Sequence, residues 1–158
     1  MRQFVFSLQK VLEYRQRLEE QAIRAFAEAQ RHLEREQAVL AELISLRDQC
    51  LQRSSRAKRL AVEMLDVEQT YLFALEGRIE AQRQRVAEAE AVLEERRQAL
   101  IEAQRERKAL ERLREKHYEQ WRQEVLRAEQ QVLDDLATVR AVFRPGELTI
   151  HTGGQDHE

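Results

Sequence analysis

The feature that most restricts the fold is a set of aliphatic residues spaced seven apart, namely Leu65, Leu72, Ile79, Val86, Leu93 and Leu100. A companion track carries Leu75, Ala89, Ala103 and Leu110. Alternating steps of three and four place such residues on one face of an α-helix, where they form the seam of a coiled coil. The spacing therefore predicts a long helix over about 62–143 that packs along a second helix.

The first third of the chain repeats the same pattern more weakly. No Pro or Gly occurs from Phe4 to Leu51, and two tracks follow the seven-residue spacing: Leu8, Arg15, Ala22, Ala29, Glu36, Leu43 and Cys50, and Leu12, Glu19, Phe26, Leu33 and Leu40. Charges at three of these positions interrupt the seam. Ser54, Ser55 and clustered bases then favour a turn. We expect a first helix over about 4–52 and a turn over about 53–61.

Together these patterns predict an all-α fold, a single antiparallel two-helix coiled-coil hairpin over residues 1–144. A turn centred near residue 57 would place Phe26 opposite Ala89 and Leu43 opposite Leu72, so that large side chains meet small ones. The helix should end before Pro145, because a proline disfavours the helical conformation of the preceding residue. Residues 145–158 are predicted to form a disordered tail.

The second helix is longer than the first, so about 30 of its residues are expected to project past the pair. An apolar stripe follows this overhang, made of Trp121, Val125, Ala128, Val132, Leu136, Val139 and Phe143. Nothing else in the sequence is left to cover the stripe, which favours a protein partner. Trp121 has a second interpretation, in which it packs near the N-terminus of the first helix.

Little in the sequence points to chemistry. The four histidines do not have the spacing of a zinc site, and no phosphate-binding glycine loop or nucleophile motif occurs. The net charge of -2 and the lack of aromatics among the bases at 53–59 argue against nucleic acid. A single cysteine, Cys50, fits a reducing cytosol. We predict a non-enzymatic protein with no cofactor, metal or small-molecule substrate.

Five short motifs follow one another along the chain: Phe4-x-Phe6-Ser7-Leu8-x-x-Val11-Leu12-x-x-Arg15, Glu19-Glu20-x-Ala22, Tyr71-Leu72-x-x-Leu75-x-x-x-Ile79, Lys108-x-Leu110-Glu111-x-Leu113 and Leu133-Asp134-Asp135-Leu136-Ala137. In this order and spacing they resemble the FliJ family of flagellar type III export proteins. The resemblance extends from Phe4 to about Arg144. It implies a cytoplasmic hairpin that looks like the stalk of a rotary ATPase.

The resemblance also implies partners: the hexameric export ATPase, the membrane protein of the export gate, and export chaperones. Such a protein would be a monomer when free and would associate peripherally with the inner membrane during flagellum biogenesis. The overhang residues Trp121, Val125, Val132, Leu136 and Val139 are then candidates for binding the ATPase. The candidates for the gate lie at the turn end and are Leu43, Leu46, Tyr71 and Leu75, although Arg78 and Gln82 add a charge and an amide to that face.

Tyr71 and Leu46 have an ordinary interpretation as well, as residues at the edge of the coiled-coil core. Two alternatives to the flagellar function also stay open. One is an equivalent stalk in a virulence injectisome. The other is a self-associating structural coiled coil, in which a second copy buries the overhang.

Overall fold

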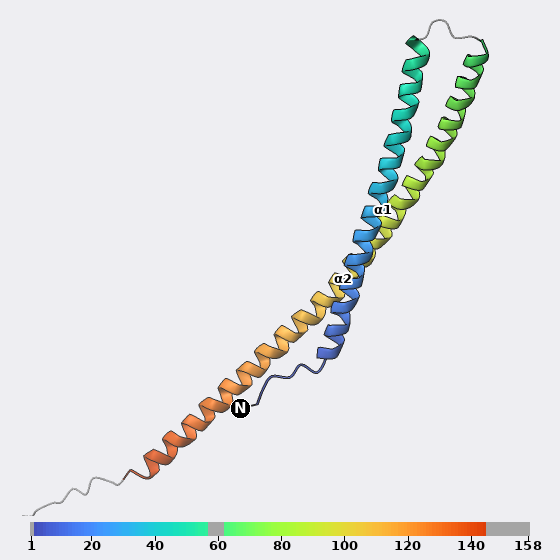
Figure 1. Cartoon of the computed structure of the whole chain (residues 1–158). Helices are drawn as coiled ribbons and strands as arrows, with labels where there is room; N and C mark the ends of the chain where they lie inside the picture. Colours follow the sequence, from blue (N-terminus) through green and yellow to red (C-terminus); the bar gives the residue numbers. More distant parts are fainter. Residues whose placement is uncertain (1, 57–61, 145–158) are drawn as a thin grey trace, which may run out of the picture. The chain divides into compact units, whose positions relative to one another are not determined.

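The computed structural model describes residues 2–56 and 62–144. It contains two helices, α1 (Gln9–Arg56) and α2 (Val62–Val142), and no strand within those residues (Figure 1). The chain divides into two compact units: Ser7–Arg112, and Met1–Phe6 together with Leu113–Glu158. The first unit is a helical hairpin, so the predicted fold class is confirmed. The predicted tail and residues 57–61 of the predicted turn lie outside the described residues.

Helix α1 begins and ends later than its sequence pattern predicts. Its first turn is closed by Leu12, whose N–H donates a 2.9 Å hydrogen bond to the carbonyl oxygen of Leu8. At the other end α1 continues through Arg56, over residues that were assigned to the turn. The bases Arg53 and Arg56 lie in its last turn, where positive charge interacts favourably with the helix dipole. These bases therefore stabilise a helix end.

The hairpin unit is held together by one seam between α1 and α2, which run side by side (Figure 1). The least exposed residues of this unit lie at seam positions of each helix: Leu12 and Ala29 on α1, which are two heptads and three residues apart, and Leu75, Ile79, Gln82 and Ala89 on α2, which follow steps of four, three and seven. Burying an aliphatic side chain in this way contributes about 1.5–3 kcal/mol. At the turn end Leu65 is largely exposed, so the seam begins one heptad later, at Leu72.

The predicted register of the hairpin is wrong by about one heptad. Ser54 was expected to face residue 61, but its hydroxyl donates a 2.7 Å hydrogen bond to Glu68 Oε2. Likewise Arg15 was expected to face Leu100 and instead forms an ion pair with Glu106. The later end of α1 moves the midpoint between the helix ends from about residue 57 to residue 59, which accounts for about half of this displacement.

Candidate functional site

The charged residues that interrupt the seam of α1 have partners on α2. Arg15 pairs with Glu106, Glu19 pairs with Arg107, and Glu36 accepts hydrogen bonds from Gln82. A buried polar group costs free energy unless it is paired, so these contacts allow a polar seam to close. Their role is structural.

Gln82 belongs to the seam and not to the surface at the turn end. Its side chain is only 5% exposed, and Nε2 donates a 2.9 Å hydrogen bond to the carbonyl oxygen of Glu36. The sequence had suggested that Gln82 and Arg78 extend the gate-facing surface. Arg78 is exposed, whereas Gln82 is covered by α1. The amide therefore does not make that surface more polar.

Arg107 is the most strongly paired cation of the hairpin. Its Nη1 lies 2.6 Å from Glu111 Oε2, and its Nε contacts the Glu19 carboxylate on α1. The hydrogen bond to Glu111, followed by that to Glu19, raises the pKa of the Arg107 guanidinium above its ordinary value. The charge of Arg107 is therefore constant at any physiological pH, and this cluster does not act as a proton donor.

At the turn end, a groove brings together two of the four residues predicted to contact the gate. The groove has a volume of about 240 Å³ and is lined by Leu46, Gln49, Cys50, Arg53, Val67, Glu68 and Tyr71. Leu46 and Tyr71 are each a little under half exposed. Because they come from different helices, a ligand in the groove would contact α1 and α2 together.

The other two predicted gate residues lie less accessibly. Leu75 is 1% exposed and packs in the seam, so it supports the hairpin and offers no surface to a partner. Leu43 is half-buried. The family motif predicted a surface position for Leu75, and the seven-residue repeat predicted a position in the seam. Its burial against α1 supports the seam. Leu46 and Tyr71 remain as the accessible pair.

Three exposed apolar residues near the turn were missed by the sequence analysis. Val67 lines the groove, Met64 lies one turn before it on α2, and Phe73 is 83% exposed on another face of the helix. The signal for Met64 and Val67 is their spacing of seven and four from Tyr71, which places the three side chains on one face outside the seam. Phe73 has no such periodic neighbour.

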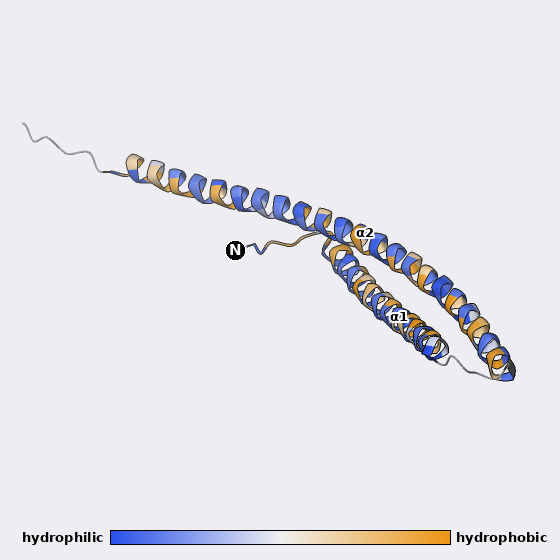
Figure 2. Ribbon diagram, turned by 90° about the horizontal axis from the view of Figure 1, so that it is seen from above, coloured by the Kyte–Doolittle hydropathy of each residue, from blue (hydrophilic) through white to orange (hydrophobic). Residues whose placement is uncertain are grey.

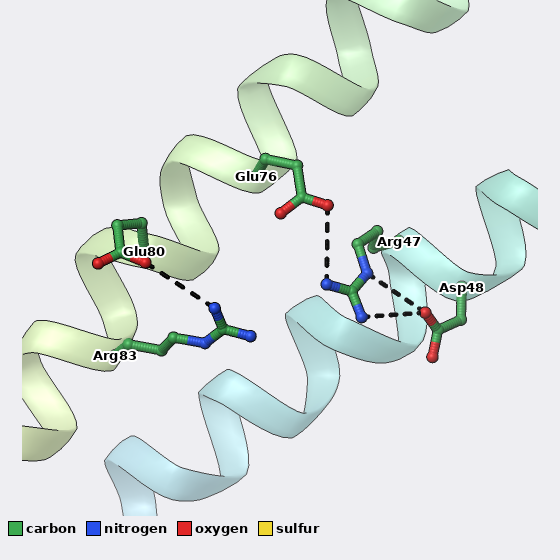
Figure 3. A network of polar contacts seen from close by, with 5 residues as sticks. All are labelled: Arg47, Asp48, Glu76, Glu80 and Arg83. Atoms are coloured by element: carbon green, nitrogen blue, oxygen red, sulfur yellow. Dashed lines mark hydrogen bonds and ion pairs between the residues drawn. The ribbon is translucent and has the colours of Figure 1, made fainter.

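An ion pair next to the groove joins the two helices. Arg47 Nη1 lies 3.6 Å from Glu76 Oε1 on α2, and Arg47 Nε donates a 3.3 Å hydrogen bond to Asp48 Oδ1 (Figure 3). One turn further along α2, Glu80 pairs with Arg83 at 3.8 Å within the same helix (Figure 3). Only the first of these contacts restricts the register, because only it crosses the seam.

The second unit has an aromatic cluster. The Phe4 ring lies 5.3 Å from the ring of Tyr118 and 5.9 Å from that of Trp121, and the rings of Tyr118 and Trp121 are 5.7 Å apart. Phe6 is buried, and its ring is 5.7 Å from that of His117. Trp121 is therefore partly covered by the N-terminal segment. This agrees with the interpretation in which Trp121 packs near the N-terminus, although on residues that precede α1.

Beyond this cluster the predicted stripe is uncovered. Val125 is half-buried, and every described residue from Leu126 to Arg144 is exposed. Val132, Leu136 and Val139, three of the predicted ATPase-binding residues, are each more than half exposed. Hydrophobic residues recur among hydrophilic ones along this part of α2 (Figure 2). The stripe also includes Phe143, and Leu126, Leu133 and Val142 widen it.

The described residues give no indication of metal or membrane chemistry. Residues 2–56 and 62–144 hold no group of three or more potential metal-ligating side chains. Within the same ranges, neither helix has a segment long and apolar enough to cross a bilayer. The surfaces that stand out are apolar and suit protein partners.

Comparison with known proteins agrees with this picture. A family model described as Flagellar FliJ protein matches residues 4–146. No curated protein and no solved structure gave a match. The matched range includes the aromatic cluster, both helices and the whole apolar stripe. The chain therefore belongs to the FliJ family and is a coiled-coil protein associated with flagellar protein export.

Proposed function

We propose that this protein is a non-enzymatic stalk of the flagellar export apparatus that binds the hexameric export ATPase and reaches the export gate. In this proposal the ATPase binds the stripe formed by Val125, Val132, Leu136 and Val139, with Trp121 at its beginning. The membrane protein of the gate binds the groove at the turn end, between Leu46 and Tyr71. The protein acts in the cytoplasm, next to the inner membrane, and also escorts export chaperones.

The observation that carries the proposal is the exposed stripe of α2. A soluble helix normally packs its apolar face on another element, whereas residues 126–144 have no cover within the described part of the chain. An apolar surface of this kind, at least 50% exposed at each of its large residues, is typical of a protein interface. Family membership favours a component of the export machinery as the partner.

The stalk would influence the ATPase by binding its conformations unequally. A ligand shifts a conformational equilibrium only through its differential affinity for the states. A rod that prefers one arrangement of the ring would favour the catalytic step that leads to it. The proposed mechanism requires no titratable or nucleophilic group of this chain.

The test is the activity of the purified export ATPase with and without this protein. The wild-type chain should stimulate ATP hydrolysis. The double substitution Leu136→Ala and Val139→Ala removes apolar contacts while keeping good helix formers, and should raise the concentration needed for half-maximal stimulation about tenfold or more. Arg127→Ala is the matched control, because Arg127 is exposed and lies on the opposite side of α2 from the stripe and from Leu126 and Leu133. Stimulation that is absent with the wild type, or undiminished with the double variant, would contradict the proposal.

A second copy of the chain is the competing partner for the stripe, as in a structural coiled coil. Sedimentation at micromolar concentration separates the two possibilities. A stable dimer that dissociates with Leu136→Ala would favour self-association, whereas a monomer favours the stalk. The equivalent stalk of an injectisome would have the same surfaces, and binding to the flagellar ATPase is what distinguishes the flagellar proposal from it.

A further inference from the structure

Residues 2–6, which we call the strap, lie against α2 with alternate side chains facing it. Phe4 and Phe6 contact aromatic residues of α2, while Val5 between them is 82% exposed. An alternation with a period of two is typical of an extended segment. The strap therefore adds no helical turn to α1 and instead places two rings on α2.

The strap covers the beginning of the apolar stripe. Phe4 packs on Trp121, which is half-buried as a result, and Trp121 lies one helical turn before Val125. Residues four apart share one face of a helix, so Trp121 and Val125 belong to the same continuous surface. The cover ends there, since every described residue from Leu126 onward is exposed.

A partner helix that follows the stripe would collide with the strap. Its side chains would pack between the stripe residues at steps of three and four, as in any two-helix interface. At Trp121 the space on that face is taken by the Phe4 ring. A partner helix can therefore contact the whole stripe only when the strap has detached from α2.

Detaching the strap from α2 requires little free energy. Its closure orders five residues, and this loss of entropy opposes the burial of two aromatic side chains. Segments with few buried contacts open at the low end of the range of local stabilities. The Phe4 ring touches residues that are themselves partly exposed, Tyr118 and Trp121, so its release uncovers little core. Phe6 is buried, and its burial is the main contact that opposes opening.

We propose that the strap is a detachable cover that competes with the export ATPase for the Trp121 end of the stripe. This inference rests on the proposed function, because the ATPase is the competing partner. When the binding-competent form is only a fraction of the molecules, the apparent dissociation constant rises by the inverse of that fraction. A strap that is closed nine-tenths of the time would weaken ATPase binding about tenfold.

The test uses the full chain with Phe4→Ala and Phe6→Ala, and the purified hexameric export ATPase. Binding should become about tenfold tighter by titration. Trp121 is the only tryptophan, so quenching of its fluorescence by iodide reports the cover directly and should increase in the free variant. Val5→Ala, at the outward position of the strap, is the matched control and should change neither measurement. A variant that lacks residues 2–6 should behave like the double variant, and circular dichroism should show unchanged helicity.

The direction in which the double variant changes the affinity for the ATPase decides whether the strap competes with it. Weaker binding by the double variant would make the strap part of the ATPase interface and overturn the competition. Equal binding by wild type and variant would also overturn it, while leaving the proposed function intact. If neither protein binds the ATPase, the proposed function falls, and the strap's role in it falls too.

Discussion

The side-chain amide of Gln82 hydrogen-bonds the main-chain carbonyl oxygen of Glu36 across the hairpin, at 2.9 Å. An apolar residue would pack at this seam position without any such requirement. The pair of Gln82 and Glu36 instead makes one register of the two helices more favourable than the others. When one helix slides past the other by seven residues, each seam residue again meets a seam residue, but Gln82 and Glu36 separate. Polar residues in a seam are known to select the register at some cost in stability.

Replacing Glu36 and Gln82 together by Leu should therefore stabilise the hairpin and loosen its register. We expect a higher midpoint of thermal unfolding and a second population displaced by one heptad, about 10 Å along the helix. Spin labels at the exposed positions Gln30 and Ala91, in a chain with Cys50→Ala, would measure the distances. One narrow distance, identical to that of the parent chain, would contradict this role of the pair. Gln82→Ala alone removes the amide that bonds Glu36, which keeps only a 4.0 Å contact with His32 Nε2, and should lower the unfolding free energy by about 1–3 kcal/mol.

Arg107 should matter more to stability than its neighbour Arg105. Arg107→Ala leaves the Glu19 carboxylate, whose side chain is largely buried between the helices, without its partner. We expect a loss of about 1–3 kcal/mol in urea unfolding. Arg105 is exposed and pairs with Glu102 within one helix, so Arg105→Ala should stay within about 0.5 kcal/mol of wild type. Equal effects of the two substitutions would show that the contact between α1 and Arg107 contributes no net stability.

The effect of Arg107 should not depend on pH between about 7 and 9, because the reference pKa of arginine lies well above this range. Its neighbours raise the pKa of the folded form above that of the unfolded form. A raised pKa stabilises the fold at every pH below the unfolded value, and that contribution is lost only as pH rises through the folded value. Both values lie beyond the alkaline end of this range. The difference in stability between wild type and Arg107→Ala should accordingly be the same at pH 7 and pH 9.

Gly77 offers a stabilising substitution. It lies in the interior of α2, where glycine costs about 1 kcal/mol relative to alanine. A Cβ placed on Gly77 would meet nothing within 4 Å, so no neighbour needs to move. Gly77→Ala should raise the unfolding free energy by about 1 kcal/mol, as measured by thermal and urea unfolding. A loss of stability would indicate that α2 needs flexibility at this position.

The seven-residue repeat was sufficient to predict the fold but not the register. Leu72, Ile79 and Leu93 lie in the seam as expected, because burial on one face depends only on spacing. The choice between registers depends on side-chain pairs such as Ser54 with Glu68, whose contribution is small beside that of the apolar seam. An estimate based on matching large with small residues could not detect a displacement of one heptad, because the repeat is preserved.

The strap and Leu75 show two other reasons why the sequence alone did not predict the structure. Residues 4–6 contain neither Pro nor Gly and precede a helical pattern, so they were assigned to the first helix. Their conformation is set instead by contacts with Tyr118 and Trp121, more than a hundred positions away in the chain. For Leu75, the family motif indicated a surface contact while the repeat indicated the seam, and the repeat was the better guide.

The groove at the turn end gives the last prediction. If the gate protein binds there, Leu46→Ala and Tyr71→Ala should each weaken binding of its purified cytoplasmic domain. The larger loss is expected for Tyr71→Ala, because an amphipathic aromatic often dominates the energy of an interface. This substitution should lower the binding free energy by about 2 kcal/mol, or roughly thirtyfold in affinity. Phe73→Ala is the control, since Phe73 is more exposed than Tyr71 but does not line the groove. Calorimetric titration would measure all three.

Leu75→Ala separates binding from folding at the same site. Leu75 is fully covered by α1, so its truncation should cost about 2–5 kcal/mol of hairpin stability. It should weaken gate binding only under conditions in which circular dichroism also shows a loss of helix. If Leu75→Ala abolished binding while the hairpin stayed fully helical, the seam would have to open for the gate protein to bind. If Phe73→Ala alone weakened binding, the contact surface would lie on the outer face of α2 and not in the groove between the helices.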